Sequence, residues 1–244
     1  MGTTHHAVTP FGPEDLTPGA PILTVQLEAP EAIPLRAKFG VTIKVTYTGE
    51  VLAEDGTKTT TDRPIIFRSW LIPSMIDPLG NNPPREGFWL FRRRASPNTE
   101  DDRNSALRQR DELWEACDMY IEACAAGVDW DGPDMEVPVT KHEYLTRDFT
   151  SLRPGETKTY HETLQWESET YLPDDTVPGD RFRFSFTGAT MDWWNWGGYE
   201  EHEKAQTTVM LPSWECGRVI LRENEKNMPT LVIPGANEIE FVIV

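Results

Sequence analysis

Cysteine, basic charge and long apolar runs are all scarce in this chain of 244 residues. The cysteines are only Cys117, Cys124 and Cys216, too few for the disulfide framework of a small secreted domain, so we expect a cytoplasmic protein. Lys and Arg number 23 against 40 Asp and Glu, and the net charge of −17 argues against nucleic-acid and anionic-membrane partners. No window reaches the 18 or so apolar residues of a membrane span, and the N-terminus does not resemble a secretory signal.

Catalytic and cofactor motifs are also lacking. The chain has no GxSxG, no P-loop and no GxGxxG after a strand. Its five histidines form no HxxxH or HExxH, and there is no CxxC, so a zinc site has little support. The acidic stretch DWDGPDME places its glycine fourth, whereas a calcium-binding EF-hand loop needs glycine at the sixth position. We therefore expect no cofactor and no metal.

What the sequence does contain is alternation of apolar and polar residues with period two. Residues 38–49 place Phe39, Val41, Ile43, Val45 and Tyr47 on one face of a strand, with Lys and Thr on the other. The same pattern predicts half-buried antiparallel strands at residues 156–166, 180–188 and 237–244. Further strands are expected at residues 21–28, 63–71, 87–92 and 207–211.

Pro-Gly pairs separate several of these runs. Residues 153–155, 177–179 and 233–235 read as turns. Many short strands joined by turns predict a mainly β protein, either an antiparallel sandwich or a barrel. We expect residues 1–20, rich in Pro and Gly, to form a flexible arm and residues 21–244 to form a single domain.

One segment, residues 98–127, breaks the β pattern. Thr99 followed by acidic residues suits a helix start, and Gly127 suits a helix end. The apolar stripe of this segment consists of Leu107, Trp114, Cys117, Ile121 and Cys124. The spacing predicts a helical insertion that packs on a sheet or caps one end of the sandwich.

Two stretches resemble a known type of module. DFTSLRPGETKTYHETL, residues 148–164, resembles an edge of immunoglobulin-like sandwiches, and DDTVPGDRFRFSFTGA, residues 174–189, resembles the strand that follows it. Bacterial intracellular proteinase-inhibitor domains and uncharacterised intracellular proteins of filamentous fungi have similar stretches. The resemblance implies an immunoglobulin-like β-sandwich fold, which hosts many unrelated functions.

The segment MDWWNWGGYEEHE concentrates the candidate site residues. The hypothesis is a ligand pocket near a strand end, with Trp193, Trp194, Trp196, Tyr199 and Glu201 binding the ligand. Asp192 and His202 are the candidate catalytic acid–base groups of such a pocket. The alternative is structural: the indoles fill the end of the sandwich, and His202 lies in a solvated acidic loop.

Three functions stay open at this point. The first is a non-catalytic binding module for an apolar small molecule or a protein partner. The second is a cofactor-free isomerase or cyclase that folds an apolar metabolite in an aromatic pocket. The third, a proteinase inhibitor, follows from the resemblance and would use residues 81–84 as an exposed loop. The basic run Arg92-Arg93-Arg94 either grips an anionic ligand or pairs with the many carboxylates of the chain.

Overall fold

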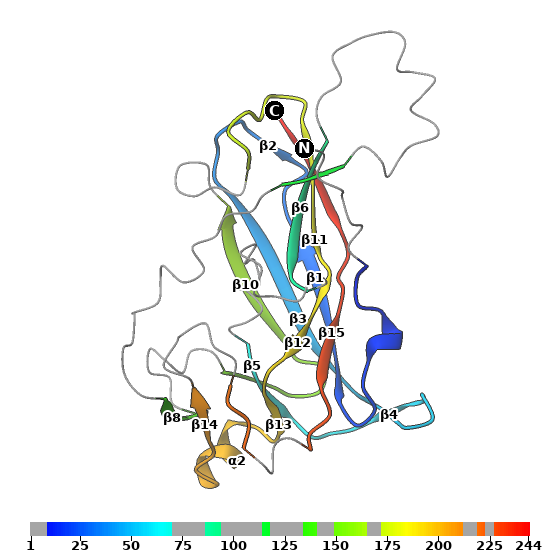
Figure 1. The fold of residues 1–244 in the computed structure, drawn as a ribbon, viewed down its shortest axis with the longest axis vertical. Helices are drawn as coiled ribbons and strands as arrows, with labels where there is room; N and C mark the ends of the chain where they lie inside the picture. The colour runs from blue at the N-terminus through cyan, green and yellow to red at the C-terminus, as the bar shows by residue number, and fades with distance from the viewer. Residues whose placement is uncertain are drawn as a thin grey trace.

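A computed structural model describes residues 9–69, 86–93, 114–117, 134–140, 149–164, 172–211, 219–222 and 227–244 of the chain. This part of the protein is mainly β, as predicted (Figure 1). Within these ranges the helical elements are a 3-10 turn, η1 (Pro13–Asp15), and one short helix, α2 (Tyr199–Lys204). Neither is long or apolar enough to cross a membrane.

The strands follow one another along the whole described chain. In order they are β1 (Pro21–Glu28), β2 (Ala32–Ile33), β3 (Phe39–Leu52), β4 (Lys58–Thr60), β5 (Ile65–Arg68), β6 (Phe88–Arg93), β7 (Glu115–Ala116), β8 (Met135–Pro138), β9 (Phe149–Leu152), β10 (Thr157–Leu164), β11 (Arg181–Phe186), β12 (Gly188–Met191), β13 (Trp194–Trp196), β14 (Thr208–Leu211), β15 (Leu231–Pro234) and β16 (Ile239–Ile243).

The first large sheet is centred on β3, which pairs antiparallel with β1 on one side and β10 on the other. Every second residue of the first part of β3 is buried, namely Phe39, Val41, Ile43, Val45 and Tyr47, as the sequence pattern predicts. The second large sheet has the order β2-β16-β11-β6-β7 and is antiparallel except for the short β2–β16 pair. Its inner face is aromatic because Phe182, Phe184 and Phe186 alternate with polar residues along β11.

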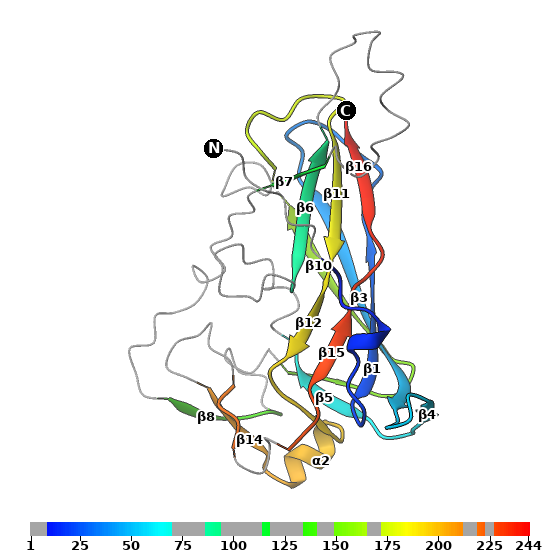
Figure 2. The same ribbon diagram turned by 45° about the vertical axis from the view of Figure 1, so that its right-hand side comes forward.

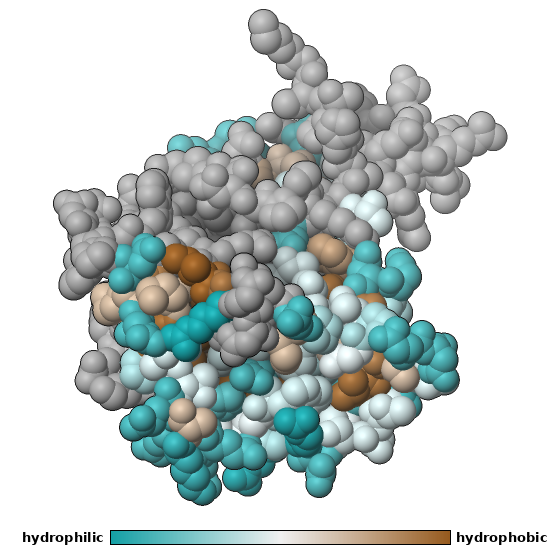
Figure 3. All heavy atoms as spheres, turned by 60° about the horizontal axis from the view of Figure 1, so that its bottom comes forward, coloured by the Kyte–Doolittle hydropathy of each residue, from teal (hydrophilic) through white to brown (hydrophobic). Residues whose placement is uncertain are grey.

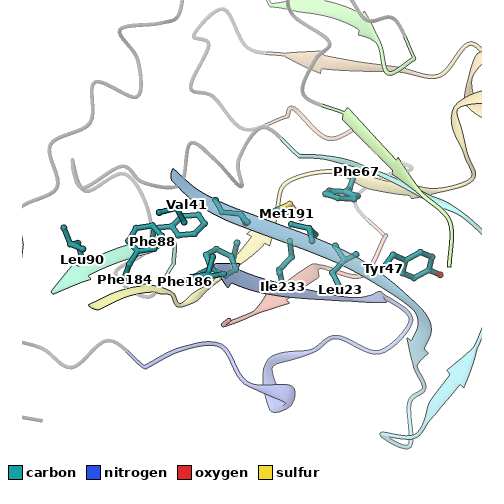
Figure 4. Packing of buried hydrophobic residues seen from close by; sticks show 14 of the residues in the cluster. Leu23, Val41, Tyr47, Phe67, Phe88, Leu90, Phe184, Phe186, Met191 and Ile233 are labelled. Atoms are coloured by element: carbon teal, nitrogen blue, oxygen red, sulfur yellow. The ribbon is translucent and has the colours of Figure 1, made fainter. Parts of the chain in front are cut away.

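The core lies between these two sheets. Leu23 and Val41 from the first sheet and Phe184, Phe186 and Phe88 from the second belong to one cluster of buried residues (Figure 4). Phe88 lies 5.3 Å from Phe184 and 4.8 Å from Phe186, measured between ring centroids. Two sheets that share one apolar interior form a sandwich, so the predicted architecture is confirmed at that level.

Three small sheets continue the sandwich at the end that carries α2 (Figures 1 and 2). They are β12–β15, β13-β5-β9 and β14–β8. A second cluster of buried side chains lies there, formed by Ile66, Val137, Val139, Phe149, Trp193, Val209 and Val219. The molecule therefore has a main core between the large sheets and a smaller core that includes Ile66 of β5.

One edge of the first sheet is closed by a side chain rather than a strand. The backbone N–H of Leu27, on β1, donates to Oδ1 of Asn237 at 2.8 Å, and Nδ2 of Asn237 donates to the Leu27 carbonyl at 3.0 Å. These two bonds imitate one rung of an antiparallel ladder. They satisfy backbone groups that would otherwise be open to another chain.

Two sequence predictions differ from the structure. Residues 9–20 are not a loose arm: the N–H of Phe11 donates to the Thr187 carbonyl and the Phe11 carbonyl accepts from Gly235. The predicted helix over residues 98–127 lies mostly outside the described residues, but Glu115–Ala116 form strand β7, paired with β6. At these two positions the backbone is extended and pairs with the second large sheet, although the spacing of apolar residues predicts a helix.

Candidate functional site

The candidate residues lie on a segment that passes through three sheets in turn. β11 belongs to the second large sheet, β12 pairs with β15, and β13 pairs with β5. The first change of sheet occurs at Gly188, whose φ is +111°. A Cβ there would lie 2.6 Å from the Phe11 ring and 2.8 Å from the Ile233 carbonyl, so only glycine fits. After this bend the chain pairs with β15 instead of with β6 and β16.

Trp193 and Trp194 are both buried, but in different cores. Trp193 belongs to the smaller core, where its ring meets Phe149 edge-on at 5.4 Å between centroids. Trp194 belongs to the main core, and its indole N–H donates to the Pro229 carbonyl at 2.8 Å. Neighbouring residues of an extended chain point to opposite sides. The first two tryptophans therefore do not line one common wall.

Trp196 is the partly exposed member of the three. Its ring meets Trp194 edge-on, with 5.3 Å between centroids. The guanidinium of Arg63 lies over the Trp196 ring, with Cζ 4.9 Å from the centroid. Its backbone pairs with Ile65 of β5. Trp196 is thus held on one side by the core and covered on another by an exposed cation.

Asp192 is engaged in a buried ion pair. Its Oδ2 accepts a hydrogen bond from Nη1 of Arg68 at 2.8 Å and another from the Val219 N–H at 2.8 Å. The side chains of Arg68 and Asp192 are each only 2% exposed. A carboxylate held in this way orders the chain around β5 and is not open to solvent.

His202 is buried in helix α2 and bonded through both ring nitrogens. Nε2 lies 3.1 Å from the Trp196 carbonyl, which can only accept, so Nε2 carries the proton. Nδ1 then accepts from the hydroxyl of Thr207 at 2.9 Å. Burial lowers the pKa of His202 below its ordinary value of 6.5, against the opposing effects of the Trp196 carbonyl and Glu201. The imidazole is therefore neutral and positions Trp196.

Tyr199 and Glu201 complete the predicted set. The Tyr199 hydroxyl donates to the Phe149 carbonyl at 2.6 Å, and burial raises the pKa of this phenol. Glu201 is exposed, and its Oε2 accepts from the Gly198 N–H at 2.6 Å at the start of α2. Both side chains shape the turn that follows Trp196.

The structure thus separates the predicted site residues into two groups. Asp192, Trp193, Trp194 and His202 lie inside the protein, while Trp196, Tyr199 and Glu201 reach the surface to different degrees. The end of the molecule that carries α2 is mainly hydrophilic, with small, separate hydrophobic patches (Figure 3). In the described ranges no group of three or more His, Cys, Asp or Glu side chains converges as a metal site.

Sequence reasoning missed two residues that organise this region. Arg68 and Arg63 lie over 120 positions before their partners Asp192 and Trp196. A signal was present for Arg68, since an arginine inside the apolar run Ile65–Arg68 needs a buried anion. Nothing in the sequence points to Arg63.

Comparisons with known proteins identify no relative of this chain. No protein-family model, no curated protein and no solved structure matches this chain.

Proposed function

We propose that this protein is a non-catalytic binding module and that Trp196 and Arg63 form the centre of its binding surface. The observation that carries the proposal is the geometry of that pair: a partly exposed indole covered by a guanidinium 4.9 Å from its centroid. Tryptophan, tyrosine and arginine are the residues most enriched among those that dominate protein interfaces. A cytoplasmic location, expected from the sparse cysteines, forms part of the same proposal.

The Trp196 ring is already ordered before any partner binds. His202 holds the Trp196 carbonyl, Trp194 contacts its ring edge, and β5 pairs with its backbone. An ordered side chain loses little conformational entropy on binding, so more of its contact energy appears as affinity. This support from buried neighbours is what distinguishes Trp196 from an ordinary surface tryptophan.

A protein partner fits this surface better than a small apolar molecule. Trp193 and Trp194 face two different cores, so the aromatic cluster does not enclose a ligand from several sides. The nearby helix α2 exposes Glu200 and Glu203, and the chain as a whole carries a charge of −17. We therefore propose a partner with an apolar or aromatic centre and a rim of Lys and Arg.

The burial of Asp192 and His202 favours binding over catalysis. A general acid or base must reach the substrate's proton directly or through one water. Asp192 is occupied by Arg68 and Val219, and His202 by Trp196 and Thr207. The isomerase or cyclase alternative would need other acid–base groups. The predicted inhibitor loop, residues 81–84, lies outside the described residues.

Selection from a displayed library of random peptides tests this proposal. Peptides are selected on the wild-type protein alone and then measured on Arg63→Gln, which removes the cation at small cost to folding because Arg63 is exposed. We expect enrichment of peptides with an aromatic residue flanked by Lys or Arg. Their affinity should fall at least about tenfold for Arg63→Gln and for Trp196→Ala.

Val177→Ala is the matched control, because Val177 is also an exposed apolar side chain, 50% accessible. This variant should bind the selected peptides like the wild type. Since Trp196 packs partly on the main core, its variant is compared only after its unfolding curve has been recorded. Selected peptides that bind both Arg63→Gln and a folded Trp196→Ala with unchanged affinity would refute the proposed surface.

A further inference from the structure

Three arginines cluster on the outer face of the second large sheet, away from the Trp196 surface. Along β11 the inner positions are Phe182 and Phe184, so Arg181 and Arg183 face outward. Along β6 the inner positions include Leu90, so Arg93 and Phe91 face outward. Arg181 is the direct cross-strand partner of Arg93, and Arg183 that of Phe91. Strands β6 and β11 lie side by side in the half of the molecule opposite α2 (Figure 2).

Arg93 and Arg181 are like charges placed directly opposite each other. Side chains in this relation have Cβ atoms about 4.5–5.5 Å apart, and like charges there repel. Across the described chain, neither guanidinium has an ion pair with a carboxylate.

The third arginine, Arg183, differs from the other two because it forms ion pairs and lies over an aromatic ring. Nη2 of Arg183 donates to Oε1 of Glu240 at 3.0 Å, and its Nε lies 3.4 Å from Glu238. Its Cζ is 4.4 Å from the centroid of Trp114. On the same face Phe91 lies nearly parallel to Trp89, with 6.4 Å between centroids. Aromatic side chains therefore lie on the same face of the sheet as Arg93 and Arg181.

We propose that this face binds an aryl phosphate monoester. The phosphate carries about −1.5 to −2 charges at neutral pH, which matches the two guanidiniums of Arg93 and Arg181. Each guanidinium can donate two parallel hydrogen bonds to phosphate oxygens. The aryl group then lies on Phe91 and the neighbouring aromatic rings. Such a group occurs in free metabolites and in phosphotyrosine, and the probes below distinguish the two.

A phosphorus NMR titration with the full-length protein tests the proposal, using phenyl phosphate and inorganic phosphate as probes. Phenyl phosphate should bind, and at least about tenfold more tightly than inorganic phosphate. Arg181→Gln and Arg93→Gln should each weaken phenyl phosphate binding at least about tenfold. Raising the salt concentration should also weaken it, because the arginines are at the surface. Arg153→Gln is the matched control, since Arg153 is an exposed arginine in the turn between β9 and β10.

Absence of phenyl phosphate binding at millimolar concentrations, or binding that survives both arginine substitutions, overturns the proposal. Equal affinity for inorganic phosphate overturns the aromatic part of the site. A short phosphotyrosine peptide serves as the third probe. Tighter binding of that peptide than of phenyl phosphate assigns the site to a protein ligand, and equal binding assigns it to a free metabolite.

Discussion

Nη1 of Arg68 lies 2.8 Å from Oδ2 of Asp192, and both side chains are 2% exposed although the two residues are 124 positions apart. The pair joins β5 to the turn between β12 and β13. Val219 also donates its N–H to the same carboxylate oxygen. Asp192 therefore holds three separate parts of the chain together.

Removing one member of this pair should destabilise the fold strongly. Asp192→Ala leaves the Arg68 cation buried without this anion, and such losses cost about 3–5 kcal/mol. Denaturant-induced unfolding, followed by circular dichroism, measures the change. A midpoint indistinguishable from that of the wild type would contradict the structural role and return Asp192 to the list of candidate catalytic groups.

The double variant Arg68→Met, Asp192→Leu provides the control for this result. Replacing a buried ion pair with apolar residues of similar volume is often neutral or stabilising. We therefore expect the double variant to recover much of the stability lost in Asp192→Ala. A double variant less stable than Asp192→Ala would show that the loss comes from packing rather than from the broken ion pair between Arg68 and Asp192.

His202 should make the stability of the protein depend on pH near neutrality. The folded pKa is lowered by burial, so between that value and 6.5 the unfolded state binds more protons than the folded state. The contribution of His202 is fully present above pH 6.5 and is lost as the pH falls through this window. Unfolding free energies measured at pH 7.5 and at pH values below 6 should show it.

His202→Gln identifies this contribution among all other titrating groups. The variant should be less stable than the wild type at pH 7.5, because it disturbs the hydrogen bonds to Trp196 and Thr207, each of which contributes about 0.5–1.5 kcal/mol. The difference between the two proteins should shrink as the pH falls. A difference that stays constant from pH 7.5 to pH 5 would mean that His202 does not titrate in this range.

Arg181→Glu should stabilise the protein while it abolishes the proposed phosphate site. The substitution replaces a like-charge cross-strand pair with Arg93 by an opposite-charge pair, a change of about 0.2–1 kcal/mol. The gain should shrink in 1 M salt. Arg153→Glu controls for the general effect of exchanging one positive charge for one negative charge, because Arg153 is also exposed. Equal stability changes in the two variants would argue against a repulsive contact at Arg93.

Asn237→Ala should open the edge of β1. The variant loses both hydrogen bonds to the Leu27 backbone, at a cost of about 1–3 kcal/mol if these groups stay unpaired. The exposed edge can then pair with a second copy of the chain. Size-exclusion chromatography at increasing protein concentration should reveal association that the wild type does not show. Asn195→Ala, in β13, is a matched control away from this edge.

The sequence alone predicted the strands well wherever one face of a sheet is buried. In β3 and β11 the alternation of apolar and polar residues identifies the buried face residue by residue. It failed where another part of the chain decides the structure. Glu115 and Ala116 lie in a segment with helical spacing, yet they pair with β6. No local pattern reports that a sheet edge is available.

The candidate site was predicted only in outline. The sequence analysis expected these residues near a strand end, and β13 does end at Trp196, but the short helix α2 was not predicted. Adjacency in sequence also could not show that Trp193 and Trp194 enter different cores. The roles of Asp192 and His202 depend on Arg68 and Thr207, which belong to other elements. Long-range partners of this kind become visible only when the chain is folded.

The path of residues 181–196 limits which kind of ligand could contact both proposed sites at once. These sixteen residues run from Arg181, at the proposed phosphate site, to Trp196, at the proposed partner surface. An extended chain covers at most about 3.3–3.6 Å per residue, so the backbone positions of the two residues are separated by no more than about 50 Å. The bends between β11, β12 and β13 shorten that span. β11 still lies in the upper half of Figure 1 and β13 near the bottom, so a small metabolite does not bridge the two sites, and a folded domain or a long extended peptide is needed to occupy both surfaces together.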